Sequence, residues 1–101
     1  MAQYDIHRFR RRSATYKYVL VVQNDFLDHL DVRLVIPAVT MTGSTRPLRR
    51  LNPLIDIEGQ PHYLRTQEMA AVRLRLLGDV VGSAKIQSAA IISAIDMLIT
   101  G

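Results

Sequence analysis

Three histidines are the first candidates for chemistry, because imidazole is a common general base and metal ligand. His7, His29 and His62 lie far apart in the chain, and none belongs to an HExxH or HxH pattern. Those spacings are what would favour a metal site. We therefore expect each histidine to lie at the surface or at a sheet edge, and we predict no metal.

Three aspartates, Asp25, Asp28 and Asp31, follow a long apolar run at a spacing of three residues. The spacing is reminiscent of a cation-binding loop, but the glycine and the closing glutamate of a calcium loop are absent. We expect these carboxylates to cap turns. The sequence also contains no GxSxG, P-loop or GxGxxG motif, so no nucleotide cofactor is predicted. A small domain without a catalytic constellation is most simply a binding protein and not an enzyme.

Composition predicts one globular domain spanning residues 1–101. The chain has 49% hydrophobic and 22% charged residues and no cysteine, so its stability must come from a core or from association and not from disulfides. No apolar run approaches the ~20 residues that cross a bilayer, and the first residues lack the apolar centre of a signal peptide. We expect a cytoplasmic protein without a membrane partner.

Basic residues outnumber acidic ones by 13 to 9, and 11 of the 13 are arginines. They gather in two places: Arg8, Arg10, Arg11 and Arg12 near the start, and Arg46, Arg49 and Arg50 in the middle. Arginine forks suit nucleic acid phosphates or an acidic protein partner. Solvated turns that keep the protein in solution are the other interpretation.

Short apolar runs predict a mainly antiparallel sheet. Residues Tyr16 to Asn24 (YKYVLVVQN) are typical of a buried strand, and VRLVIPAV is a second strand in which Pro37 favours an edge, a bulge or a strand end. PLIDIEGQPHYLR indicates a hairpin with Gly59 and Gln60 in its turn, and the alternation in VRLRLL predicts a half-buried strand. With QYDIHRF this gives five or six strands. They are too closely spaced for helical crossovers, so we expect a sheet that is partly curled into a barrel.

From Ser83 to Ile99 the apolar period becomes helical, with Ser83 as the predicted N-cap. Ile92 and Ile99 fall beside the main apolar face and should be partly exposed, as an interaction surface would be. The face predicted to pack on the sheet comprises Ile86, Ala90, Ile91, Ala94, Ile95, Met97 and Leu98.

Four ordered motifs resemble the CcdB family, the toxins of plasmid and chromosomal toxin–antitoxin modules. They are VQND–FLD (Val22 to Asp28), RLVIP (Arg33 to Pro37), L-x-T-x-x-M-A (Leu64 to Ala70) and the final AID-x-LITG. The resemblance runs nearly from end to end. It implies an SH3-like curled sheet with a C-terminal helix, and a two-fold homodimer. It also implies inhibition of DNA gyrase: the toxin binds the A subunit and traps the gyrase on cleaved DNA. A CcdA-type antitoxin neutralises the toxin. The toxin itself is expected to contact DNA only indirectly, through its complex with the antitoxin.

The resemblance assigns roles to particular residues. The gyrase-facing positions are Phe26, Leu27, Asp96, Ile99, Thr100 and Gly101, and the antitoxin-facing hairpin carries Arg8, Arg10, Arg11 and Arg12. The well-studied toxin ends in Trp-Gly-Ile, where this sequence has Thr100 and Gly101. An aromatic anchor is typical of binding hot spots, so weaker or absent poisoning is one expectation. Val21 also stands where an acidic residue is usual, and Arg73 where a proline is usual.

Two other functions stay open. The sister MazF/Kid family shares the barrel and the dimer, and the basic clusters suit an RNA backbone, although no paired acid and base residues stand out in the sequence. A homologue that has lost poisoning and retains only antitoxin binding is the third possibility. Growth arrest on induction separates this third possibility from the others, and cleaved DNA bound to gyrase separates poisoning from RNA cleavage.

Overall fold

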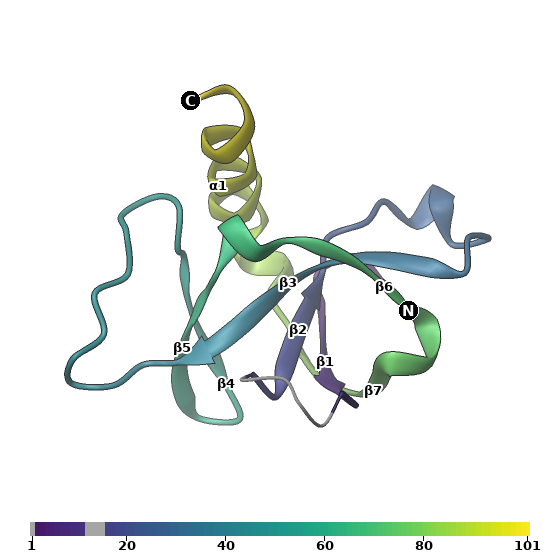
Figure 1. Cartoon of the computed structure of the whole chain (residues 1–101), viewed down its shortest axis with the longest axis horizontal. Helices are drawn as coiled ribbons and strands as arrows, with labels where there is room; N and C mark the ends of the chain where they lie inside the picture. The colour runs from purple at the N-terminus through teal and green to yellow at the C-terminus, as the bar shows by residue number, and fades with distance from the viewer. Residues whose placement is uncertain (1, 12–15) are drawn as a thin grey trace.

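The computed structural model describes residues 2–11 and 16–101, and its strands form one curled antiparallel sheet (Figure 1). The strands follow the order β4-β5-β3-β2-β1-β7, with β6 also paired to β3. In the described residues they are β1 (Asp5–Phe9), β2 (Tyr18–Val21), β3 (Val32–Thr40), β4 (Leu54–Ile57), β5 (Gln60–Leu64), β6 (Ala70–Arg73) and β7 (Leu77–Ser83). One α-helix, α1 (Ser88–Thr100), follows the sheet in the part of the chain that is described. The predicted mainly-β fold with a C-terminal helix is confirmed.

The long strand β3 organises the sheet, because it pairs with β2 on one side and with two strands on the other. Pro37 lies in the middle of β3, in regular register with β2, and not at the edge, bulge or strand end that we predicted. The Pro37 carbonyl accepts a hydrogen bond from the Arg65 amide at 2.9 Å, on the side away from β2. The missing N–H of Pro37 falls on this same side, where pairing passes from β6 to β5, so no ladder bond is lost.

Alternate residues of β2 pack into two apolar clusters on opposite faces of the sheet. Leu20 belongs to the larger cluster, which α1 covers with Ile91. Val19 and Val21 belong to the smaller one. The buried members of the larger cluster are Tyr4, Ile6, Leu20, Val22, Ile36, Ala38, Ile55, Ile57, Leu64, Ala84 and Ile91.

The β4–β5 hairpin is present, but its turn lies one residue earlier than predicted. Ile57 pairs with Gln60, which is already the first residue of β5. Glu58 and Gly59 form the turn with φ of +51° and +79°. Two successive positive φ values characterise the type I′ turn, whose twist matches that of the flanking strands.

The predicted strand VRLRLL ends at Arg73, where a 3-10 turn, η3 (Leu74–Leu76), takes over. The chain must turn here because β6 pairs with β3, whereas the next strand, β7, pairs with β1. Strand β7 was not predicted. It lies close against β1: a Cβ at Gly78 would stand 3.1 Å from the Arg8 carbonyl oxygen and 3.2 Å from the Arg8 Cβ.

The helix begins later and is covered less than predicted. Ser83 ends β7 and is not the N-cap of the helix: Ala84 is the N-cap of a 3-10 turn, η4 (Lys85–Gln87), and Gln87 is the N-cap of α1. The Ser83 hydroxyl accepts from the Lys85 amide at 3.2 Å. Of the predicted packing face only Ile91 and Ala94 are buried, and Ile95 is partly buried. The face is wrong at its ends: Ile86 is 96% exposed, and Ala90, Met97 and Leu98 are also exposed.

Figure 1 gives the reason, because α1 projects outward from the sheet and its last turns extend beyond the strands. Ile92 and Ile99, predicted to be partly exposed, are 56% and 70% exposed. Among the described residues, no helix combines the length and the hydropathy needed to cross a bilayer.

Candidate functional site

The outer turns of α1 present apolar side chains while their polar groups are satisfied within the helix. Thr100 donates its hydroxyl to the Asp96 carbonyl and carboxylate oxygens at 2.9 and 3.0 Å. The Gly101 amide closes the last turn on the Met97 carbonyl at 3.1 Å, with φ of +78° at Gly101. Beside these residues Ile99 is 70% exposed. The last turn is therefore closed by its own hydrogen bonds while it presents apolar side chains to solvent.

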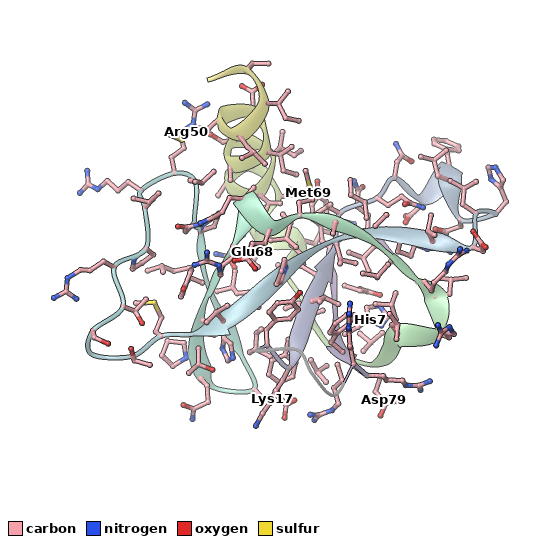
Figure 2. The ribbon with its side chains drawn as sticks, viewed as in Figure 1. His7, Lys17, Arg50, Glu68, Met69 and Asp79 are labelled. Carbon is pink, nitrogen blue, oxygen red and sulfur yellow. The ribbon has the colours of Figure 1, made fainter. Side chains whose placement is uncertain are left out.

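The loop between β3 and β4 reaches the same helix through one arginine. Figure 2 shows Arg50 at the tip of this loop beside α1. Its Nε donates to the Ser93 hydroxyl at 2.8 Å, and its guanidinium lies 3.7 Å from the Asp96 carboxylate. Both charged groups are about half exposed, so the ion pair contributes little stability. The ion pair places the Arg50 guanidinium beside Asp96. The other two arginines of this basic cluster, Arg46 and Arg49, are exposed.

A second apolar surface lies in the loop after β2, where a 3-10 turn, η1 (Asp25–Leu27), presents its side chains outward. Phe26 is 89% exposed and Leu27 is 44% exposed. The Phe26 amide donates to the Asn24 side chain at 2.9 Å, and the Gln3 amide donates to the Asp25 carboxylate at 2.8 Å. The turn is thus held by hydrogen bonds, while the Phe26 ring that it carries is exposed to solvent.

Arg33, at the start of β3, holds this loop in place from within. It is only 4% exposed, and it donates to the carbonyls of Leu30 at 2.7 Å, Val32 at 2.8 Å and Asp28 at 2.9 Å. Hydrogen bonds from a charged, desolvated donor are the strong ones. Sequence reasoning missed this role, although a lone arginine within an apolar strand was a visible signal.

Gln23 supports the loop in the same way, because it bridges the loop and the strand beside it. Its side-chain amide donates to the carbonyls of Leu27 at 3.2 Å and Val32 at 3.3 Å, and its oxygen accepts from the Leu34 amide at 3.0 Å. Gln23 is 9% exposed. The surface formed by Phe26 and Leu27 is therefore preorganised, which lowers the entropic cost of binding through it.

The structure does not bring the two groups of gyrase-facing candidates together within one chain. In Figure 1 the turn η1 and the outer end of α1 lie on separate parts of the molecule. Phe26 and Leu27 form one surface, and the other four candidates form the second. They are Asp96, Ile99, Thr100 and Gly101.

The first basic cluster differs from the turn that we expected. Arg8 lies within β1, and its guanidinium donates to the Glu58 carboxylate at 2.8 Å. Arg10 and Arg11 are exposed beyond the end of the strand. Arg12 lies outside the described residues. Arg10 and Arg11 are thus the described members of the cluster that extend past the sheet.

The prediction that each histidine lies at the surface or at a sheet edge is wrong for His7 and His62, which lie in the inner strands β1 and β5. His7 and His62 are 2% and 4% exposed, whereas His29 is exposed. The Nδ1 of His7 lies 3.0 Å from the Gly78 carbonyl and that of His62 lies 2.9 Å from the Gln60 carbonyl, so both rings carry a proton on Nδ1. Within the described residues, no group of three potential metal ligands is present.

One ionisable group next to α1 has a shifted pKa. The Tyr63 hydroxyl accepts from Arg65 at 3.3 Å, and Glu68 forms an ion pair with the same guanidinium. Together they raise the pKa of Arg65, with the Tyr63 hydrogen bond as the larger cause. Arg65 therefore stays charged, and it anchors a 3-10 turn, η2 (Thr66–Glu68), against which α1 packs.

Solved structures share this architecture. An endoribonuclease in complex with its cognate antitoxin, from a mycobacterial species, matches with a TM-score of 0.80 at 15% identity over 98% of this chain and 94% of that one. An Mtb toxin matches at 0.76 and 20% identity, over 93% of this chain and 99% of that one. The Mycobacterium tuberculosis toxin MazF-mt6 matches at 0.76 and 22%, over 93% and 94%. The chain thus has a fold found in small toxins.

The family itself follows from the sequence match. The CcdB protein family model covers residues 3–101, which is essentially the whole chain. The protein belongs to the CcdB family, whose members are toxins of toxin–antitoxin modules.

Proposed function

We propose that this protein binds the A subunit of DNA gyrase, traps the gyrase complex on cleaved DNA, and is neutralised by a CcdA-type antitoxin in the cytoplasm. Membership of the CcdB family supports the proposal. In this mechanism the protein acts by binding and carries out no catalysis on the gyrase or the DNA.

The observation that carries the proposal is the exposed apolar end of α1. Ile92, Leu98 and Ile99 are 56%, 40% and 70% exposed on a helix that projects beyond the sheet. Apolar side chains gathered on one ordered element are typical of a protein-binding surface. Asp96, held by Arg50, adds a fixed charge at its border.

We infer that two copies of the chain form a homodimer. Apolar residues outside α1 are also left uncovered, among them Leu54 at 56% and Val80 at 53% exposure, and a domain of this size without disulfides gains stability from association. A two-fold dimer presents two helix ends and two copies of the Phe26 loop. This arrangement offers a way to combine surfaces that a single chain keeps apart.

For the antitoxin, the proposed contact is Arg10 and Arg11 together with Arg12. CcdA-type tails are acidic and disordered, so arginine forks beyond the end of β1 suit them. Arg8 contributes less, because Glu58 already neutralises it.

The test is a pull-down with purified gyrase A subunit, followed by a gyrase DNA-cleavage assay. We expect the intact protein to retain the subunit and to accumulate cleaved DNA, and Ile99→Ala to weaken both. Ile86→Ala is the matched control, because it removes an isoleucine that is 96% exposed outside the outer turns of α1. Antitoxin binding without gyrase binding would replace the proposal with a homologue that has lost poisoning.

A further inference from the structure

Strand β4 lies at the border of the sheet, so one side of its backbone has no neighbouring strand within the described part of the chain (Figure 1). The Leu64 amide donates to the Pro53 carbonyl at 2.9 Å, which places the backbone groups of Pro53 on the side of β5. Successive residues of a strand turn their backbone groups to opposite sides. The N–H and C=O groups of Leu54 and Asp56 therefore lie on the open side, where an edge strand can pair with another chain.

The side chain of Gln87 already makes one of the hydrogen bonds that a further strand would make. Its Nε2 donates to the Leu54 carbonyl at 2.6 Å, on the open side of β4. Among the described residues, no side chain makes a corresponding contact with the backbone of Asp56. The edge thus accepts a donor at Leu54 and is open at Asp56.

A groove of about 490 Å³ lies beside this edge. Its walls include Leu54, Asp56 and Gln87, together with Met41 and Pro61. Asp56 lies opposite Pro61 in the β4–β5 register, and the Met41 amide donates to the Pro61 carbonyl at 3.0 Å, so these three residues form a row across the sheet. Leu54 is 56% exposed. The groove therefore offers room for the side chains of a segment that lies along β4.

Asp56 gives the open edge its charge. Its side chain is exposed, and it forms no ion pair with another described residue. Glu58, the next carboxylate along the chain, is paired with Arg8 at 2.8 Å. A cationic side chain directly across from Asp56 would be stabilising. A second copy of β4 would not supply one, because Asp56 is the one charged residue of this strand.

We propose that β4 is a docking site for an extended segment of a partner protein, which adds to the sheet as a further antiparallel strand. A lysine or arginine of the segment lies opposite Asp56, and an apolar side chain two residues later lies opposite Leu54 and covers it. Antiparallel pairing is the more stable arrangement and is the one that the described strands use. Because it reverses the chain direction, the recognised pattern is basic-x-apolar. In Figure 1, β4 and the outer end of α1 lie on separate parts of the molecule.

The test is an NMR titration of the intact protein with the synthetic peptide acetyl-Thr-Lys-Val-Ile-Thr-amide, and with the same peptide in which glutamate replaces the lysine. We expect the lysine peptide to bind more tightly, to shift the amide signals of Leu54 and Asp56, and to slow the hydrogen exchange of both amides. Asp56→Asn should weaken binding of the lysine peptide by about three- to fivefold. Asp56→Lys should reverse the preference, so that the glutamate peptide binds more tightly.

Gln87→Ala gives a second variant that leaves the charge of the edge unaltered. It frees the Leu54 carbonyl for the peptide, so it should tighten binding by about threefold. Asp79→Asn is the matched control, because Asp79 is likewise exposed and lies on β7, at the other end of the sheet. This control should bind both peptides as the intact protein does.

Failure of the lysine peptide to bind, equal binding of the two peptides, or signal shifts away from β4 would each overturn the proposal. Slower exchange at Leu54 and Asp56 as the concentration of the free protein rises would show that a second copy occupies the edge, which would also overturn it. Removal of residues 99–101 should leave peptide binding unchanged, so this test and the gyrase test fail independently.

Discussion

Ile91 and Ile99 are the same residue type on the same helix, yet one is fully buried and the other is 70% exposed. Ile91 packs in the larger core cluster, whereas Ile99 lies in the outer turns of α1. Truncation to alanine at the two positions therefore separates folding from binding. Each variant acts as the control for the other.

The magnitudes follow from the burial. Ile91→Ala removes a fully enclosed side chain and should cost about 2–5 kcal/mol of unfolding free energy, which lowers the Tm by at least about 8 °C for a domain of this size. Ile99→Ala should change the unfolding free energy by no more than about 0.5 kcal/mol. If Ile99 is a hot spot, the same change weakens gyrase A binding by about 2 kcal/mol, or roughly 30-fold.

Thermal unfolding by circular dichroism and titration calorimetry with gyrase A subunit measure the two effects. We expect a stability loss with Ile91→Ala, and a binding loss at unchanged Tm with Ile99→Ala. Equal destabilisation by both changes would show that the outer turns are structural. Unchanged binding by a stable Ile99→Ala protein would place the gyrase contact elsewhere.

Three further outcomes are expected. Arg33→Met should lower the free energy of unfolding by about 3 kcal/mol, because three carbonyls lose a charged donor. It should also broaden the NMR signals of the Phe26 loop. Sharp, unshifted loop signals would contradict this role of Arg33. Replacing Arg10, Arg11 and Arg12 by serine should weaken antitoxin binding more at low salt than at high salt, and equal affinity at low salt would remove the assignment. Thr100→Trp should strengthen gyrase binding by adding an aromatic anchor; an unchanged affinity would count against it.

The sequence predicted the fold where one property decided the outcome. Alternating Ile55 and Ile57 placed the hairpin correctly, because both side chains are buried on one face. The predicted turn was one residue too late, because a glutamate such as Glu58 does not indicate a positive φ. Strand β7 was missed because its glycines and polar residues do not form the apolar alternation of a strand. Its pairing depends on the close approach of Gly78 to β1, which the sequence pattern does not indicate.

The helix shows a different limit of sequence reasoning. Its apolar period is broad enough to fit several packing faces, and only the direction in which α1 leaves the sheet decides that Ile91 and Ala94 are buried. The exposed positions Ile92 and Ile99 were nevertheless predicted from that period.

The most direct test of the account is a gyrase DNA-cleavage assay with the intact protein and with a variant that lacks residues 99–101. The deletion removes only exposed residues, so it should leave the Tm and antitoxin binding nearly unchanged. We predict that the intact protein accumulates cleaved DNA bound to gyrase and that the variant does not. Equal amounts of cleaved DNA with both proteins, or none with the intact protein, would contradict the claim that the end of α1 is the toxic surface.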